Sequence, residues 1–148
     1  MPVRDSDPLV GFHFGVEVQG KIQGYFTEVA GLGSETEVIE HKVVNEQGLE
    51  VVQKLPGRLK WDNITLKRGI TKSMDVWNWR KMVEDGNVEG ARADGSIIMF
   101  DQTLNEVARW NFERAWPVKV SGPQLQSDSN AFGVEEMILA HEYIVRVK

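Results

Sequence analysis

The feature that most constrains the fold is a single helix signal in a chain that otherwise reads as strands. It lies in the stretch WDNITLKRGITKSMDVWNWRKMVEDG, residues 61–86. Ile64 and Leu66 alternate with polar neighbours, which is the period of a half-buried strand. Gly69 interrupts this run, and the helix that follows ends at Gly86. The sequence therefore predicts a sheet-based domain with one flanking helix.

The predicted helix carries one apolar stripe. At about 100° per residue, Val76, Trp79 and Val83 share one face, which we expect to pack on a sheet. Thr71 or Ser73 is the expected N-cap, because a hydroxyl accepts a hydrogen bond from a free N–H group of the first turn.

Trp77 lies on the polar flank of the same helix, away from the apolar stripe. A large aromatic side chain at such a position is either tucked against a loop of its own chain or buried by another chain. Both interpretations are open, and the second makes Trp77 a candidate inter-subunit contact.

Alternating apolar and polar residues predict strands along most of the remaining chain. The expected strands are residues 12–18, 25–29, 35–44, 49–55, 63–67, 95–101, 107–120 and 134–148. Pro117 lacks a backbone donor, so we place it at a sheet edge or a kink. Residues 30–34 form either a bulge or a bend between two sheets.

The C-terminal stretch, residues 134–148, permits two interpretations. Apolar residues at most odd positions and a β-branched end favour a strand. One uninterrupted strand of this length would run ~50 Å, well beyond the usual ~20 Å. A helix is the rival, because Met137 and Ile138 recur as Tyr143 and Ile144 roughly seven residues later. We adopt the strand.

Residues 35–59 predict a long, polar hairpin without a core of its own. Charged residues are spread along both strands, residues 45–48 read as its turn, and the returning strand ends at Pro56-Gly57-Arg58. A two-stranded ribbon packed on nothing is marginal in water. We therefore expect a neighbouring chain to stabilise it, with a mobile hairpin as the plain alternative.

Length and composition restrict the possible classes of protein. The 148 residues, 41% of them hydrophobic, suit a single globular domain, residues 1–148. Residues 1–8 are mostly polar, so we expect a loose N-terminal arm without a Sec-type export signal. Without cysteine there is no disulfide and no thiolate chemistry. A net charge of −5 with dispersed basic residues argues against a nucleic-acid groove.

No catalytic constellation is recognisable in the sequence. The three histidines, His13, His41 and His141, are too far apart for a metal-binding motif, so structural roles are expected. The neighbouring acids Glu135 and Glu136 are interpreted as part of a solvated face. The sequence therefore predicts a protein that is not an enzyme and that has no cofactor or metal site.

Three segments in order resemble the inner tube protein of contractile injection systems, a family that includes phage tail tube proteins. They are FHFGVEVQGKIQGYFTEVAGLGSETEVIEH, LPGRLKWDNITLKRGIT with the WNW helix, and FERAWPVKVSGPQLQSDSNAFGVEEMILAHEYI, and together they cover nearly the whole chain. The resemblance implies a mainly β fold, a β-barrel-like two-sheet sandwich with one flanking α-helix. It also implies hexameric rings that join their sheets edge to edge and stack into a hollow tube.

The same resemblance implies a set of partners and a location. The partners would be further copies of the chain, a sheath protein, baseplate and tube-terminating proteins, and cargo in the lumen. The tube would assemble in the cytoplasm and belong to a phage-tail-like particle or virion, and contraction of the sheath would drive it through a target membrane. Polar outward positions, among them Glu17 and Glu136, are candidates for the lumen face.

With this architecture, the hairpin of residues 35–59 becomes the expected contact between subunits. The candidate contact residues at its turns are Gln47, Gly48, Pro56, Gly57 and Arg58. Turn chemistry alone explains the glycines and the proline equally well.

Two alternatives are open. A monomeric β-barrel could bind a small ligand in a cavity lined by tryptophans, the candidates being Trp61, Trp79, Trp110 and Trp116. The tube protein of a type VI secretion system would have the same architecture as the leading interpretation.

Overall fold

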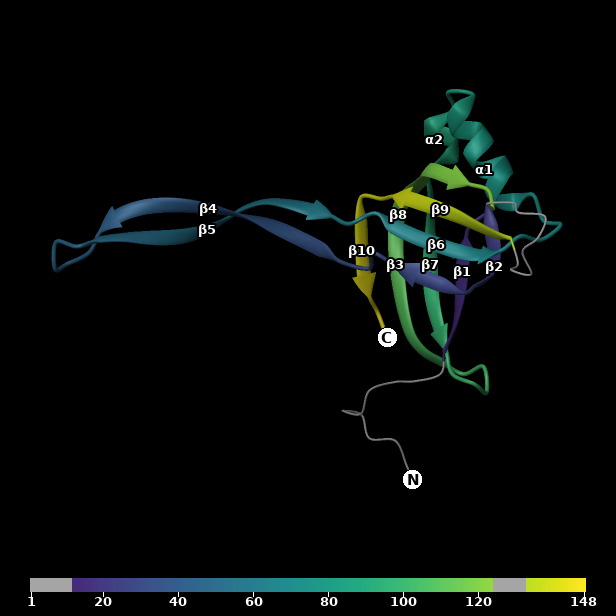
Figure 1. The fold of residues 1–148 in the computed structure, drawn as a ribbon, viewed down its shortest axis with the longest axis horizontal. Helices are drawn as coiled ribbons and strands as arrows, with labels where there is room; N and C mark the ends of the chain where they lie inside the picture. Colours follow the sequence, from purple (N-terminus) through teal and green to yellow (C-terminus); the bar gives the residue numbers. More distant parts are fainter. Residues whose placement is uncertain (1–11, 124–132) are drawn as a thin grey trace.

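The computed structural model describes residues 12–123 and 133–148, which form a β-rich body and a long projecting ribbon (Figure 1). The expected N-terminal arm lies outside the described residues. The strands are β1 His13–Val18, β2 Ile22–Phe26, β3 Glu28–Ala30, β4 Ser34–Val44, β5 Glu50–Trp61, β6 Ile64–Gly69, β7 Ala93–Phe100, β8 Glu106–Ser121, β9 Val134–Ala140 and β10 Tyr143–Arg146. The helices are α1 Asp75–Glu84 and α2 Val88–Ala91.

The body consists of two antiparallel sheets that share β8. The first sheet contains β2, β1, β7, β8 and β10, and the second contains β8, β9, β6 and β3. Residues of β8 up to Ala115 pair in the first sheet, and those from Trp116 pair in the second. The predicted two-sheet, mainly β architecture is confirmed.

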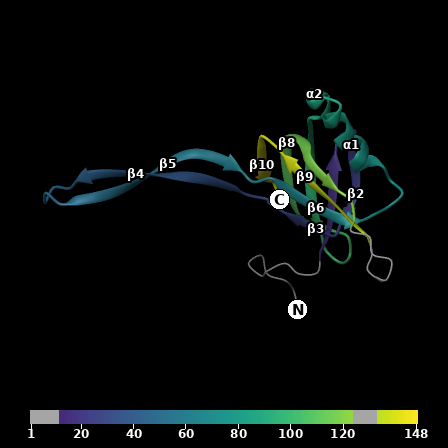
Figure 2. The same ribbon diagram turned by 45° about the horizontal axis from the view of Figure 1, so that its top comes forward.

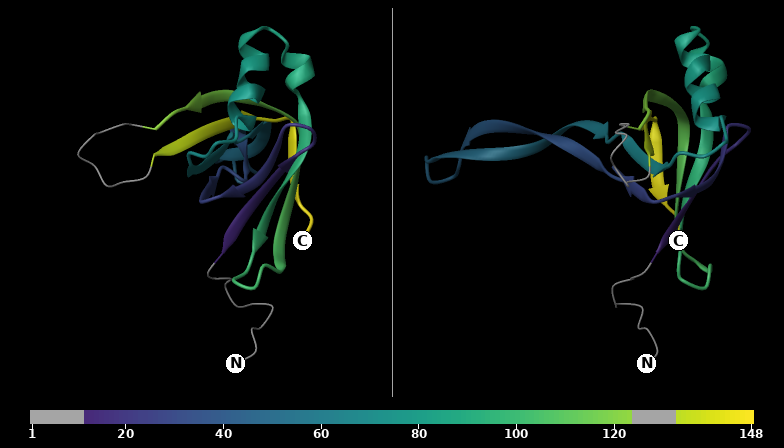
Figure 3. Two further views of the ribbon diagram at one scale, coloured as in Figure 1. Left: turned by 90° about the vertical axis from the view of Figure 1, so that its right-hand side faces the viewer. Right: turned by 45° about the vertical axis from the view of Figure 1, so that its right-hand side comes forward.

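A sharp corner in β8 carries the chain from one sheet to the other (Figure 3). Arg114 has a left-handed backbone with φ 53°, and the pairing with β9 shifts register just after Pro117. Such irregularities bend a strand and increase its twist. Pro117 therefore lies at a kink, one of the two positions predicted for it.

The core fills the space between the sheets. The first sheet contributes Val16, Ile97 and Phe112, and the second contributes Leu66 and Leu139. Successive residues of a strand point to opposite faces, and these side chains lie on the inward faces of their strands.

Helix α1 closes one end of the body with its apolar stripe (Figures 1 and 2). Val76 and Trp79 are fully buried, Val83 packs beside them, and the indole N–H of Trp79 donates to the carbonyl oxygen of Ala91 at 2.6 Å. The predicted packing of this stripe is confirmed. Neither helix in the described part of the chain has the length or hydrophobicity needed to cross a membrane.

Two details of the helical region differ from the prediction. Helix α1 begins after Met74 without a side-chain cap, so neither Thr71 nor Ser73 is the N-cap. The hydroxyl of Thr71 accepts the backbone N–H of Ser73, and the hydroxyl of Ser73 accepts the backbone N–H of Asp75, the first residue of the helix. The sequence predicted a single helix, but the segment after α1 contains the short helix α2, Val88–Ala91. There the side chain of Asn87 accepts a hydrogen bond from the backbone N–H of Gly90 at 3.1 Å.

The C-terminal segment is extended, as predicted, but it is not one strand. It breaks at His141 and Glu142, so that β9 lies in the second sheet and β10 in the first. Buried residues change phase at the break, from Met137 and Leu139 to Ile144. The crossing between the two sheets explains both the break and the phase change.

Candidate functional site

The ribbon formed by β4 and β5 is the most unusual part of the molecule. Its two strands pair with each other from Ser34 and Trp61 to Val44 and Glu50, and with no other strand of the described residues. Figures 1 and 2 show it projecting away from the body. The predicted hairpin is confirmed, and nothing in the described body packs along its length.

The tip of the ribbon is a turn organised by Asn45. Its side-chain oxygen accepts hydrogen bonds from the backbone N–H groups of Gln47 at 3.0 Å and Leu49 at 2.9 Å. Gly48 adopts φ 78°, a left-handed conformation that glycine reaches without a steric penalty. Gln47 and Gly48 thus lie at the predicted turn, and their role in subunit contact stays a prediction.

The prediction that Pro56-Gly57-Arg58 ends the returning strand is wrong. Thr36 pairs with Leu59 and Val38 with Pro56, so the single residue Glu37 lies opposite both Gly57 and Arg58. This is a β-bulge inside β5, which continues to Trp61.

The bulge leaves little room for a side chain at Gly57. A Cβ on Gly57 would lie 3.0 Å from the side chain of Ile39 and 3.2 Å from the carbonyl oxygen of Glu37. The bulge is about 30 Å along the strand from Gly48. The five candidate residues of the ribbon therefore occupy two separate places, the tip and the bulge.

The ribbon is less polar than the sequence analysis suggested. Eight large apolar side chains between residues 38 and 59 are exposed: Val38, Ile39, Val44, Leu49, Val51, Val52, Leu55 and Leu59. Charged residues lie between them on both strands, and this hid them from a search for one apolar face. The exposed apolar surface is the signal that sequence reasoning missed.

The base of the ribbon is fixed to the corner between β9 and β10. The Trp61 ring lies edge-on to Tyr143 with 5.4 Å between centroids, and 6.0 Å from the ring of His141. Nε2 of His141 lies 2.9 Å from the carbonyl oxygen of Asp62, and the backbone N–H of Asp62 donates to the carbonyl of Gly33. These contacts give His141 a structural role and set the direction in which the ribbon leaves the body.

A buried ionic cluster connects the second sheet to α1. Nε of Arg68 donates to Oε1 of Glu135 at 2.7 Å, and a terminal nitrogen of Arg68 pairs with Asp75. Burial alone would lower the pKa of the Arg68 guanidinium, but hydrogen bonds and charge attraction from Asp75 and Glu135 raise it above its ordinary value. Glu135 is 2% exposed, so its assignment to a solvated face is wrong.

Trp77 takes part in the same cluster. Its indole N–H donates to Oε2 of Glu135 at 2.8 Å, and its ring lies near Gly122. The side chain is half-buried by its own chain, which is the first of the two interpretations considered for it. A contact of its remaining surface with another subunit stays a prediction.

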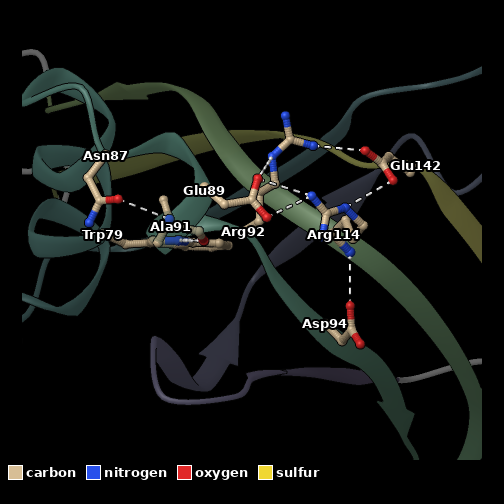
Figure 4. A network of polar contacts seen from close by, with 9 residues as sticks. Trp79, Asn87, Glu89, Ala91, Arg92, Asp94, Arg114 and Glu142 are labelled. Atoms are coloured by element: carbon tan, nitrogen blue, oxygen red, sulfur yellow. Dashed lines mark hydrogen bonds and ion pairs between the residues drawn. The ribbon is translucent and has the colours of Figure 1, made fainter.

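A second polar network surrounds the corner in β8 (Figure 4). The backbone N–H of Arg114 donates to Asp94 at 2.9 Å, and its guanidinium pairs with Glu89 at 3.0 Å and Glu142 at 3.1 Å. Glu89, and then Glu142, raise the pKa of Arg114 above its ordinary value. Arg92 also pairs with Glu142, at 2.8 Å. The network ties together α2, the corner of β8 and the break between β9 and β10.

The described residues offer little for a ligand-binding interpretation. Trp79 is buried in the core, Trp116 packs against it, Trp110 lies under the guanidinium of Arg146, and Trp61 anchors the ribbon. Neither of two surface pockets in the described part of the chain is lined by tryptophan. Within the same residues, no group of three or more histidine or acidic side chains is placed to hold a metal ion.

The polar outward positions do not lie on one surface. Glu17 is exposed on the first sheet, where it lines the larger, mainly polar pocket together with Ser96, Arg109 and Asn111. Glu136 lies on the second sheet and pairs with Lys67 at 3.7 Å. The distinctive feature of the described residues is a ribbon whose two strands pair only with each other and whose apolar side chains are exposed.

Comparisons with known proteins agree with this architecture. A computed alignment with solved structures finds the sheath-tube complex of an extracellular contractile injection system, PVC, in its extended state, at 24% identity, covering 96% of this chain and 93% of that chain with a TM-score of 0.79. The PVC sheath/tube terminator gives 24% identity, 98% and 100% coverage and a TM-score of 0.80. Hcp1 from Flavobacterium johnsoniae gives 17% identity, 91% and 94% coverage and a TM-score of 0.59.

These identities are low, so the structural likeness by itself establishes only a shared fold. A comparison with curated protein sequences gives no match. Residues 10–145 match the family model described as T4-like virus tail tube protein gp19, and this match spans nearly all of the chain. The chain therefore belongs to the tail tube protein family of T4-like virus gp19.

Proposed function

We propose that this tail tube protein is the repeating subunit of a hollow inner tube, in which rings of six copies stack on one another. The observation that carries the proposal is the ribbon, whose apolar side chains are left exposed by the described residues of its own chain. A protein that acts alone gains nothing from a ribbon that cannot support itself in water. A stacked assembly supplies the missing contacts.

The sheet edges support the same proposal. The pairing order of the body ends at β2 and β3, and β10 pairs only with β8 among the described residues. Free edges are sites for strand addition, and closure into a ring removes them. Edge-to-edge joining of neighbouring bodies would form a continuous inner barrel around a lumen for cargo.

The similar solved structures support a set of proposed partners. These are described as parts of a sheath-tube complex, a tube-terminating cap and a baseplate. For this chain we propose a sheath protein, a baseplate and a tube terminator as partners, assembly in the cytoplasm, and a place in a phage-tail-like particle. A type VI secretion tube is the second candidate, because a solved structure described as a type six secretion system protein shares the fold with a TM-score of 0.59.

Light scattering on the purified chain tests the proposal. The wild-type protein is expected to form particles of many times its 16.8 kDa chain mass as concentration rises. A matched variant replaces residues 36–59 with a two-residue Asn-Gly turn between Glu35 and Lys60, which face each other across the ribbon. It should keep the circular dichroism spectrum of the folded body and lose the stacked particles.

The opposite results would contradict the proposal. A wild-type chain that remains a monomer at every concentration, including with preformed tube ends added as nuclei, is not a tube subunit. A variant without the ribbon that still forms long stacked particles would show that stacking does not need the ribbon.

A further inference from the structure

The turn between β7 and β8 holds a residue that its backbone does not favour. The backbone N–H of Asp101 donates to the carbonyl oxygen of Asn105 at 3.0 Å and closes a three-residue loop. The last residue of this loop, Leu104, adopts φ 63°. Hairpin loops of this kind favour glycine at that position, because a left-handed backbone strains a residue that has a Cβ. Glycine or asparagine would therefore fit the backbone of Leu104 with less strain.

The described residues of the chain give the Leu104 side chain little to contact. It is 57% exposed and lies outside the core cluster. Arg114, the other non-glycine residue with a positive φ in the described part of the chain, differs, because its guanidinium pairs with Glu89 and Glu142. Strained residues cluster where function needs their side chains. The backbone of Leu104 therefore indicates a contact made outside its own chain.

The turn is held in one conformation by its own hydrogen bonds. The carboxylate of Asp101 accepts the backbone N–H and the hydroxyl of Thr103, at 2.9 and 2.8 Å, and the backbone N–H of Asn105 at 2.9 Å. The side-chain amide of Asn105 donates to the hydroxyl of Thr103 at 2.9 Å. A preorganised contact loses little conformational entropy on binding. The turn thus presents Leu104 as a fixed apolar side chain among polar neighbours.

The other end of β7 borders the larger of the two surface pockets, which we call the hollow. It has a volume of about 770 Å³ and lies between the β1–β2 turn, the start of β7 and the middle of β8. It is lined by the exposed polar side chains of Glu17, Gln19 and Gln23 and by the buried apolar side chains of Val18, Ile22 and Phe112. The hollow thus combines apolar and polar surface, as the turn does.

The turn and the hollow of one chain cannot meet. Gly95 and Ser96 line the hollow at the start of β7, and the turn follows Phe100 at its end, about 20 Å away. In Figure 1 the turn lies at the bottom of the body, whereas α2, which precedes β7, lies at the top. A contact between two different surfaces of identical copies can repeat from copy to copy without closing. Opposite ends of one sheet are therefore suited to open-ended stacking.

We propose that Leu104 of each copy docks in the hollow of a second copy in the next ring. This inference rests on the proposed function, because stacked rings bring the two ends of the first sheet together in every copy. It assigns to the body a contact that is separate from the ribbon. Each copy repeats the contact at every junction between rings, so a change in one side chain has a large effect on stacking.

Substitutions at Leu104 separate the contact from the fold. Leu104→Asn supplies a residue that tolerates the left-handed backbone but removes the apolar side chain. The dissociated chain should unfold at the same or a higher urea concentration, while the critical concentration for assembly rises at least about tenfold. Leu104→Met is the matched control, because it keeps an apolar side chain of similar volume, and it should assemble within about threefold of wild type.

Chemical crosslinking identifies the surface that Leu104 contacts. The chain has no cysteine, so Leu104→Cys with Gln23→Cys places one thiol in the turn and one in the hollow. A short bismaleimide added to tubes should link copies head to tail into a ladder of many covalent species on a denaturing gel. Leu104→Cys with Glu136→Cys is the control, because Glu136 lies on the second sheet, and it should give no such ladder.

The outcomes separate the two proposals. Assembly of Leu104→Asn at the wild-type critical concentration overturns the inference alone. So do tubes of the Leu104 and Gln23 cysteine pair that give no ladder, or a ladder of equal length from the control pair. A wild-type chain that never assembles overturns the proposed function, and this inference with it.

Discussion

Replacing Arg68 with methionine tests the reasoning about the buried ionic cluster. The side chain of Arg68 is 7% exposed and lies between Glu135, at 2%, and Asp75, at 18%. Methionine retains much of the aliphatic stem but removes the charge and all donors. Among the described residues, Glu135 then keeps its side-chain hydrogen bond from Trp77, and its charge has no partner in the cluster.

The expected loss in the free energy of unfolding follows from how deeply the carboxylates of Glu135 and Asp75 are buried. Removing one member of a buried pair costs about 3–5 kcal/mol, because an uncompensated charge stays behind. Asp75 is more exposed than Glu135, so water can solvate its carboxylate more easily once Arg68 is removed. We therefore expect a loss in the free energy of unfolding at the lower end of this range, about 3 kcal/mol. For a domain of this size that loss lowers Tm by roughly 6–12 °C. Trp77→Phe removes a single hydrogen bond to the same carboxylate and should cost less, about 1.5 kcal/mol.

Urea unfolding of the ribbonless variant, followed by tryptophan fluorescence, is the appropriate assay, because assembly would otherwise add to the apparent stability. A second substitution, Glu135→Leu, in the Arg68→Met background removes the stranded charge. The double variant should therefore be more stable than the sum of the two single losses predicts. A loss below about 1 kcal/mol for Arg68→Met, or strictly additive losses, would refute the reasoning.

Two further predictions concern single positions. Gly31→Ala should lower the free energy of unfolding by more than about 3 kcal/mol, because Gly31 has φ 85° and an added Cβ would lie 1.9 Å from the carbonyl oxygen of Asn63. Gly86→Ala is the matched control outside the ribbon: its φ is 90° and nothing lies within 4 Å, so only about 1 kcal/mol of left-handed strain is expected. Equal losses in urea unfolding would contradict the close approach at Gly31. Backbone and side-chain donors of Asn105 and Thr103 lower the pKa of Asp101 in the folded protein. This carboxylate therefore stabilises the fold above its unfolded pKa of about 4, and the contribution is lost as pH falls through the folded value. An NMR titration should find that lowered pKa, and a midpoint at or above about 4 would contradict the turn geometry.

The sequence predicted the features that depend on local periodicity. Alternation located β1 and β6, and the helical stripe placed Val76 and Trp79 in the core. These signals are strong because each residue's face follows directly from its position along the strand or helix. The ribbon was found in the same way, from two strands with a turn between them.

The errors arose where a distant segment decides the structure. Pro56-Gly57 has the local chemistry of a turn, but the pairing with β4 continues past it and turns it into a bulge. Glu135 appears solvated beside Glu136, yet its partner Arg68 is 67 residues away in the sequence. Neither contact can be predicted from the residues that neighbour it in the sequence. Both become visible only in the three-dimensional structure.

The central claim is that the chain is a tube subunit whose ribbon contacts neighbouring copies. Electron cryomicroscopy of the assembled wild-type protein, with helical reconstruction, tests it most directly. The account predicts hollow tubes of stacked six-fold rings, with density for residues 34–61 in contact with neighbouring copies. Tubes in which the ribbon projects into solvent, or rings whose contacts exclude it, would contradict the account.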